Sequence, residues 1–214
     1  MPGAFQHMRD TVDRKRRAFW LKHLHRWHWI SSAVSLVVLL LFSITGFTLN
    51  HAARIEASPH VERHTATLPD ALLKQLAGTG AKSAPLPAPV AAFVVANTGA
   101  PVSGRAGDWS DDEVYVSLPR PGGDGWVGID RETGDVQYET TDRGWLAYLN
   151  DLHKGRNTGP VWSGFIDVFA LACIVFALTG LLLLKMHAGQ RGMTWPMVAL
   201  GFVLPVVLAL LFIH

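Results

Sequence analysis

The sequence predicts a membrane protein that has three transmembrane α-helices and a small α+β domain between the first two of them. Three stretches without any charged residue carry this prediction: residues 29–49, 168–184 and 194–213. A helix that crosses the apolar core of a bilayer needs roughly 20 apolar residues, each rising ~1.5 Å. The first and third stretches are long enough, and the second is long enough if its helix begins near Val161 and includes Asp167.

The three predicted helices divide the chain into six segments. The first apolar stretch does not resemble a cleavable signal peptide, because a long basic tail precedes it and residues 50–53 (Asn-His-Ala-Ala) form a poor cleavage site. We expect a basic tail at 1–28, a transmembrane helix at 29–50, an extracytoplasmic domain at 51–160, a second transmembrane helix at 161–186, a loop at 187–194 and a third transmembrane helix at 195–214.

The distribution of Lys and Arg predicts the orientation, because these residues collect on the cytoplasmic side of inner-membrane proteins. The basic tail holds seven of them against Asp10 and Asp13, and the loop after the second helix holds Lys185 and Arg191 without an acid. We therefore expect a bacterial inner-membrane protein with a cytoplasmic N-terminus, a periplasmic C-terminus and helices in contact with the lipid bilayer. The net charge of +2 is the sum of two opposed regions and predicts no nucleic-acid partner.

The segment outside the membrane has the pattern of a small α+β domain. Residues 68–76 have helical spacing with Pro69 in the first turn, and residues 83–89 have the composition of a linker. The turn at Thr133-Gly134-Asp135 stands between two short apolar runs, which is typical of a β-hairpin. We expect strands at 91–95, 114–118, 126–129 and 136–138, and loops at 104–110 and 120–125.

An internal repeat relates the first two predicted helices. Each unit contains a Leu-His-basic tripeptide, an apolar helix with a Phe-x-x-Thr-Gly element, and a histidine six to eight residues after the Thr. These elements are Leu24-His25-Arg26, Phe42-Ser43-Ile44-Thr45-Gly46 and His51 in the first unit, and Leu152-His153-Lys154, Phe176-Ala177-Leu178-Thr179-Gly180 and His187 in the second. One helix should run outward and the other inward, so the two units have inverted topology.

The repeat places histidines near both faces of the membrane. We expect His25, His28 and His187 on the cytoplasmic side, and His51 and His153 on the outer side. About 23 residues, or ~34 Å of helix, separate His28 from His51, which matches the thickness of the apolar core. A b-type haem takes two axial imidazoles, commonly from facing helices. The pattern therefore predicts two stacked haems b, with the histidines as ligands to the iron.

The ligand assignment leaves one choice open. His51 and His153 are expected to hold the outer haem, and His187 is expected to hold the inner haem together with His25 or His28, which are i and i+3 on one helical face. Each histidine also has a simpler explanation, because an amphipathic ring suits the headgroup region of a bilayer. The remaining histidines are expected to be solvated or merely terminal: His7, His23, His60, His64 and His214.

Asp167 is the one formal charge among the apolar residues of the predicted transmembrane helices, away from their ends. Such residues are costly in a membrane and usually face a partner. We expect Asp167 to accept a hydrogen bond from a ligand imidazole, to pair with Arg156, or to make a hydrogen bond that packs two helices. The small residues of the Thr-Gly pairs at 45–46 and 179–180 would let another helix, or a flat porphyrin, approach closely.

These motifs resemble the PepSY-associated transmembrane family. The resemblance covers the chain from Leu24 to His187 and rests on residues 24–29 (LHRWHW), 42–46 (FSITG), 49–51 (LNH), 152–156 (LHKGR) and 178–180 (LTG). It implies a haem-binding inner-membrane reductase that passes electrons to a ferric siderophore or another periplasmic acceptor. The outer segment at 128–135 is similar to the strand-turn-strand of a PepSY domain. The chain differs from the larger siderophore reductases in having three predicted helices and one short outer domain.

Three functional hypotheses follow. The first is a di-haem membrane oxidoreductase that takes electrons from a cytoplasmic or membrane donor and reduces an outer ferric chelate or flavoprotein. The sequence has no G-x-G-x-x-G that leads directly from a strand into a helix, so a nicotinamide or flavin donor would be a separate partner. The alternative is a membrane-anchored PepSY-like binding or regulatory module without a redox cofactor. The third is a protein whose histidines bind iron or copper directly. The sequence leaves open whether the chain forms a homo-oligomer.

Overall fold

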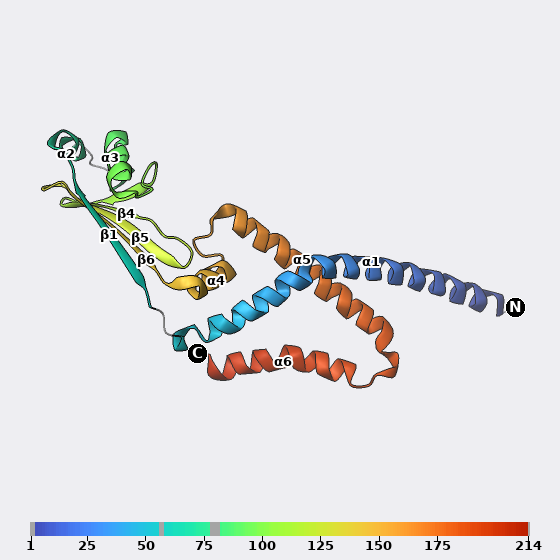
Figure 1. Cartoon of the computed structure of the whole chain (residues 1–214). Helices are drawn as coiled ribbons and strands as arrows, with labels where there is room; N and C mark the ends of the chain where they lie inside the picture. Colours follow the sequence, from blue (N-terminus) through green and yellow to red (C-terminus); the bar gives the residue numbers. More distant parts are fainter. Residues whose placement is uncertain (1–2, 56–57, 78–81, 214) are drawn as a thin grey trace. The chain divides into compact units, whose positions relative to one another are not determined.

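The computed structural model describes residues 3–55, 58–77 and 82–213 (Figure 1). By its internal contacts the chain divides into two compact units. The first unit joins Met1–Leu40 to Asp167–His214, and the second is the continuous segment Leu41–Ile166. His214 lies outside the described residues, so the structure assigns it no role.

The apolar stretches form three long helices, α1 (Gly3–Asn50), α5 (Gly159–His187) and α6 (Thr194–Phe212). In the described part of the chain, the segments long and apolar enough to cross a membrane are Val12–Asn50, Gly159–His187 and Thr194–Phe212. In the most apolar part of each helix, only 11% of the residues are buried within the protein for the first two helices, and none for the third. Their apolar side chains therefore face outward, as a lipid environment requires, and the prediction of three helices is confirmed.

The second unit carries a six-stranded antiparallel sheet whose strand order is β1-β6-β5-β4-β3-β2. The strands are β1 (His60–Thr67), β2 (Ser83–Pro85), β3 (Ala106–Trp109), β4 (Glu113–Ser117), β5 (Gly123–Asp130) and β6 (Asp135–Asp142). The predicted hairpin is confirmed, because β5 and β6 pair with Ile129 opposite Val136 and the turn residue Gly134 has φ +78°. We call residues 60–154 the sheet domain.

Three short helices complete the sheet domain: α2 (Asp70–Leu76), α3 (Ala88–Thr98) and α4 (Gly144–Lys154). Apolar side chains of α2 and α3 join those of the strands in one core, whose fully buried members include Leu76, Val90, Val94, Val116 and Ile129. Figure 1 shows α2 and α3 beside the sheet. Burial of such side chains at roughly 1.5–3 kcal/mol each is the main favourable term in the stability of this domain.

Two expectations for the sheet domain were wrong. Residues 91–95, expected as a strand, belong to α3, and the expected linker at 83–89 contains β2 and the start of that helix. Pro89 stands in the first turn of α3, where its missing N–H costs nothing, and Gly99 at φ +76° ends the helix with a left-handed cap.

Other elements were not foreseen or were placed only in part. The expected loop at 104–110 contains β3, and strand β5 begins inside the expected loop at 120–125. Strand β1 and helix α4 were not predicted at all. The expected helix at 68–76 and the expected strand at 114–118 agree with α2 and β4 to within two residues.

Candidate functional site

In the first unit, a histidine of α1 lies against α5. The Nδ1 atom of His28 is 3.0 Å from Oγ1 of Thr179 and 3.2 Å from the carbonyl oxygen of Phe176. Its imidazole stacks on the Phe176 ring, with 4.7 Å between centroids and 14° between planes. A Cβ atom at Gly180 would stand 3.2 Å from Cε1 of His28, so glycine makes room for the imidazole. We call these four residues the His28 site.

In the second unit, a histidine of α4 lies against α1 in the same way. The Nδ1 atom of His153 is 2.7 Å from Oγ1 of Thr45. Its imidazole packs on the Phe42 ring, with 4.8 Å between centroids and 36° between planes. A Cβ atom at Gly46 would stand 3.4 Å from Cε1 of His153. We call these four residues the His153 site.

The two sites are built from the two copies of the Phe-x-x-Thr-Gly element. In each copy the Phe supplies a surface for the imidazole, the Thr supplies a hydroxyl for Nδ1, and the Gly leaves space for Cε1. The histidine comes from a different helix in both cases. The order of motifs in the sequence paired His25 with His153, but the structure places His28 in the position equivalent to His153.

The other three candidate histidines, His25, His51 and His187, form hydrogen bonds with backbone carbonyl oxygens one helical turn earlier. The Nδ1–H groups of His25, His51 and His187 donate to the carbonyl oxygens four residues earlier, at 2.8, 2.9 and 2.8 Å. A carbonyl oxygen can only accept, so Nδ1 carries the proton in each neutral ring. The Nε2 atom of each ring therefore keeps its lone pair, and a metal would bind at this atom.

The structure brings two of the candidate ligands together. The rings of His25 and His187 meet edge to face, with 5.8 Å between centroids and 85° between planes. Nearby, the Arg17 guanidinium donates to the carbonyl oxygen of Met186 at 3.1 Å, which also ties α1 to the end of α5. Within the described residues, no ring contact joins His51 to His153; His51 packs instead on the ring of Phe47.

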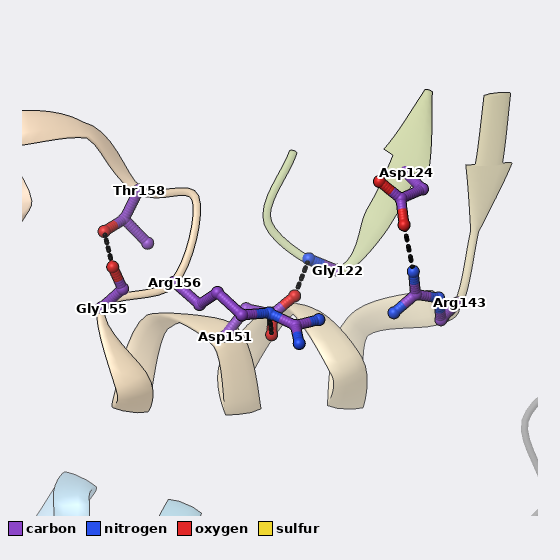
Figure 2. A network of polar contacts seen from close by, with 7 residues as sticks. All are labelled: Gly122, Asp124, Arg143, Asp151, Gly155, Arg156 and Thr158. Atoms are coloured by element: carbon purple, nitrogen blue, oxygen red, sulfur yellow. Dashed lines mark hydrogen bonds and ion pairs between the residues drawn. The ribbon is translucent and has the colours of Figure 1, made fainter. Parts of the chain in front are cut away.

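Arg156 does not pair with Asp167, which was one of the expectations for these two residues. Arg156 forms its ion pair with Asp151, with 3.1 Å between Nε and Oδ1 (Figure 2). Asp167 is exposed on α5, and its carboxylate has no hydrogen-bond or ion-pair partner among the residues that the structure describes. A hydrogen bond from a ligand imidazole to the Asp167 carboxylate stays a prediction.

Helix α4 connects the His153 site to the sheet. The buried carboxylate of Asp151 accepts a hydrogen bond from the backbone N–H of Gly122 at 2.9 Å, and Arg143 at the start of the helix pairs with Asp124 at 2.9 Å (Figure 2). On α1, Oγ1 of Thr48 lies 3.3 Å from Oδ1 of Asn150. The buried Asp151 carboxylate thus ties α4, and with it His153, to the loop before β5.

The sheet domain also has an open acidic pocket with a volume of about 770 Å³. Its lining includes Asp112, Glu113, Asp130 and Asp135 together with polar residues of β1 and β6. The backbone N–H groups of Thr133 and Glu132 bond to the Asp130 carboxylate and lower its pKa.

Burial also shifts a titratable group on strand β4. Partial burial of Tyr115, and then the carboxylates of Asp124, Glu113 and Asp108, raise the pKa of this phenol. The exposed His60 and His64 of β1 lie on the sheet and outside both histidine sites, as expected for solvated residues.

Comparison with protein families identifies the chain. The model of the PepSY_TM-like family matches residues 19–214, which is most of the chain and includes both histidine sites. The chain belongs to the PepSY_TM-like family. The comparison with curated proteins gave no match, and neither did the comparison with solved structures.

The histidines of this PepSY_TM-like protein are side chains of the kind that can hold a haem. In the described part of the chain, no three His, Cys, Asp or Glu side chains converge on one point. A haem iron needs only two axial imidazoles from the protein, since the porphyrin supplies the other ligands. The unprotonated Nε2 atoms of His25, His51 and His187 are consistent with such a group.

Sequence reasoning selected the five histidines as candidates but missed how two of them are held. It assigned Thr45 and Thr179 to close packing only, although their hydroxyls contact His153 and His28. The signal was present, because both threonines occupy the same place in the two copies of the repeat. Asp151 and Gly122 carried no such signal, since their contact joins a loop to a helix that was not predicted.

Proposed function

We propose that this PepSY_TM-like protein is a di-haem electron-transfer protein that carries electrons across the bacterial inner membrane to a periplasmic acceptor. The observation that carries the proposal is the pair of matching sites, in which two copies of one motif each hold an imidazole from another helix. A packing role alone does not require an aromatic surface, a hydroxyl and a glycine to recur around a histidine in both copies.

His51 and His153 would hold the outer haem, and His187 with His25 or His28 would hold the inner haem. The contact between the rings of His25 and His187 supports the first choice, and the His28 site supports the second. When bound, a b-type haem supplies reversible one-electron chemistry at its iron. The residues of the protein hold the imidazoles and leave Nε2 without a proton.

The direction of transfer follows from the basic tail and the basic loop after α5, which support a cytoplasmic N-terminus. In the sequence, His28 and Thr45 stand near opposite ends of the first apolar stretch, so one haem would lie near each membrane face. The electron donor is a cytoplasmic or membrane protein. The acceptor is a ferric siderophore, another ferric chelate or a flavoprotein in the periplasm.

The proposal is tested in proteoliposomes that hold dithionite inside and a ferric chelate outside. The wild-type protein should reduce the external chelate well above the leak rate of protein-free liposomes. His153→Ala should lower that rate at least about tenfold, because loss of an axial ligand empties the outer site. His64→Ala is the matched control, since His64 is an exposed histidine of β1. Equal rates for the wild type and His153→Ala would contradict the proposal.

A further inference from the structure

We propose that Thr45 and Thr179 are positioning residues that fix the tautomer of His153 and His28, so that Nε2 of each imidazole presents its lone pair for axial coordination. This inference rests on the proposed di-haem function. It assigns the two threonines to a task that close helix packing does not require, and it follows from counting the protons at each site.

The hydroxyl proton of each threonine is already used. Oγ1 of Thr179 lies 2.7 Å from the carbonyl oxygen of Val175 and 3.0 Å from that of Phe176. Oγ1 of Thr45 lies 3.0 Å from the carbonyl oxygen of Leu41, one turn earlier on its own helix. A hydroxyl has one proton, and a helical threonine gives it to the preceding turn. Toward a histidine, each hydroxyl can therefore only accept.

The surroundings of His28 require the same assignment by a second route. Its Nδ1 atom faces two oxygens, Oγ1 of Thr179 at 3.0 Å and the carbonyl oxygen of Phe176 at 3.2 Å. The carbonyl is an acceptor whatever the hydroxyl does. An unprotonated Nδ1 would place a lone pair against that oxygen, in apolar surroundings where an unpaired polar group costs about 1–3 kcal/mol. Nδ1 of His28 therefore carries the proton.

His153 has a single partner at Nδ1, and its assignment follows from the repeat. The contact between Nδ1 and Oγ1 of Thr45 is 2.7 Å, and the hydroxyl has the same place in the motif as that of Thr179. With Nδ1 protonated, the remaining ring nitrogen Nε2 is bare in both histidines. A haem iron binds an unprotonated imidazole nitrogen, so this tautomer is the one prepared for coordination.

The hydroxyls appear where the imidazole lies against a different helix. In His25, His51 and His187, Nδ1 carries the proton and donates it to a carbonyl oxygen four residues earlier. His28 and His153 instead point their Nδ1 at another element, α5 in one case and α1 in the other. A threonine on that element serves the purpose that a carbonyl serves for the other three. All five histidines thereby have Nε2 free.

The test measures the tautomer directly in the full chain without haem. The chain, labelled with ¹⁵N at histidine and produced in haem-deficient cells, is placed in lipid bilayers, and ¹⁵N NMR distinguishes protonated from bare ring nitrogens. His28→Ala and His153→Ala spectra identify the two signals. We expect a protonated Nδ1 and a bare Nε2 for both histidines in the wild type. In Thr45→Val, His153 should acquire a substantial population with Nε2 protonated, and Thr45→Ser should restore the wild-type signal.

Thr48→Val is the matched control. Thr48 is one turn from Thr45 on α1, and its hydroxyl bonds to Asn150 and to the carbonyl of Thr45 and not to an imidazole. Its replacement should leave the His153 signal unchanged. An unchanged His153 signal in Thr45→Val, or a protonated Nε2 in the wild type, would overturn the inference.

A haemin titration of the same samples separates this inference from the proposed function. Thr45→Val should bind haemin about 10–100-fold more weakly at one of two sites, because loss of a group that orients a ligand has effects of that size. Thr45→Ser should restore the affinity. A wild-type chain with the expected tautomers that binds no haemin would contradict the di-haem function and leave the assignment of the tautomers supported. Two filled sites with equal affinity in Thr45→Val would overturn the role of the threonine.

Discussion

The carboxylate of Asp151 accepts a hydrogen bond from the backbone N–H of Gly122 at 2.9 Å, two residues before His153 on the same helix. The loop before β5 is thereby joined to α4, which carries one of the two histidine sites. The second oxygen of Asp151 pairs with Arg156 at 3.1 Å. A single buried side chain therefore connects the sheet to the position of a candidate haem ligand.

Replacing Asp151 with Ala should loosen α4. The change leaves the N–H of Gly122 without its partner and Arg156 without its counter-ion, and removal of one member of such a group costs about 2–4 kcal/mol. Hydrogen–deuterium exchange of the detergent-solubilised chain should become faster in peptides of α4. Asp124→Ala, which removes only an exposed ion pair with Arg143, is the control and should change exchange little. Equal exchange in the two variants would contradict this account of α4.

Gly122 should tolerate alanine less well than Gly104. Both have nearly the same left-handed backbone, with φ +72° and +71°, so both substitutions incur the cost of an L-residue there. A Cβ atom at Gly122 would also stand 2.8 Å from Cα of Tyr148 on α4, whereas nothing lies within 4 Å at Gly104. Thermal unfolding should show Gly122→Ala to be less stable by at least about 1 kcal/mol than Gly104→Ala. Equal stability would mean that the loop does not pack on α4 as described.

Gly180→Val should displace the imidazole of His28. The added atoms would enter the space next to Cε1, where even a Cβ atom would be at 3.2 Å. Overpacking of this kind costs about 1–3 kcal/mol, so the ring should leave the His28 site. Gly164→Val, on the same helix with nothing within 4 Å of its Cβ, is the control. Solid-state NMR of the His28 ring should change in the first variant alone, and an unchanged ring signal would argue against the role given to Gly180.

The stability of the β5–β6 hairpin should depend on pH through Asp130. The N–H groups of Thr133 and Glu132 hold the pKa of this carboxyl below its ordinary value of 3.8. A lowered folded pKa means that the stabilisation is fully present above the unfolded value and is lost as the pH falls through the folded one. Asp130→Asn keeps an acceptor but no titrating charge. The difference in unfolding temperature between the two proteins should therefore shrink between about pH 5 and pH 3; a constant difference would contradict the assignment.

The membrane helices were predictable because the bilayer imposes a length and a composition that are visible in one stretch of sequence. The repeat was also visible in the sequence, because the Phe, Thr and Gly at 42, 45 and 46 recur with identical spacing in the second helix. The sequence could not decide whether His25 or His28 is the inner ligand, because both lie on one face of α1. The choice depends on where α5 packs, and that contact joins residues 148 or more positions apart.

The errors in the sheet domain have a local cause. The run Phe93-Val94-Val95 is apolar and made of aromatic and β-branched residues, which favours a strand. Pro89 and Gly99, however, delimit a helix whose buried face includes Val90 and Val94. These two signals could have identified α3. Strand β1 could not be found in this way, because its side chains are exposed and its pairing with β6 is long-range.

The most direct test of the di-haem account is the number of haems bound per chain in the detergent-purified protein, measured by the pyridine haemochrome assay. The wild type should contain two haems b with a six-coordinate, low-spin visible spectrum. His51→Ala and His153→Ala should each retain about one, which stays low-spin, and only one of His25→Ala and His28→Ala should lose a haem. A colourless wild-type protein from haem-replete cells would contradict the account and favour a PepSY-like binding module. A full haem content in both His51→Ala and His153→Ala would contradict the assignment of these two histidines to the outer haem.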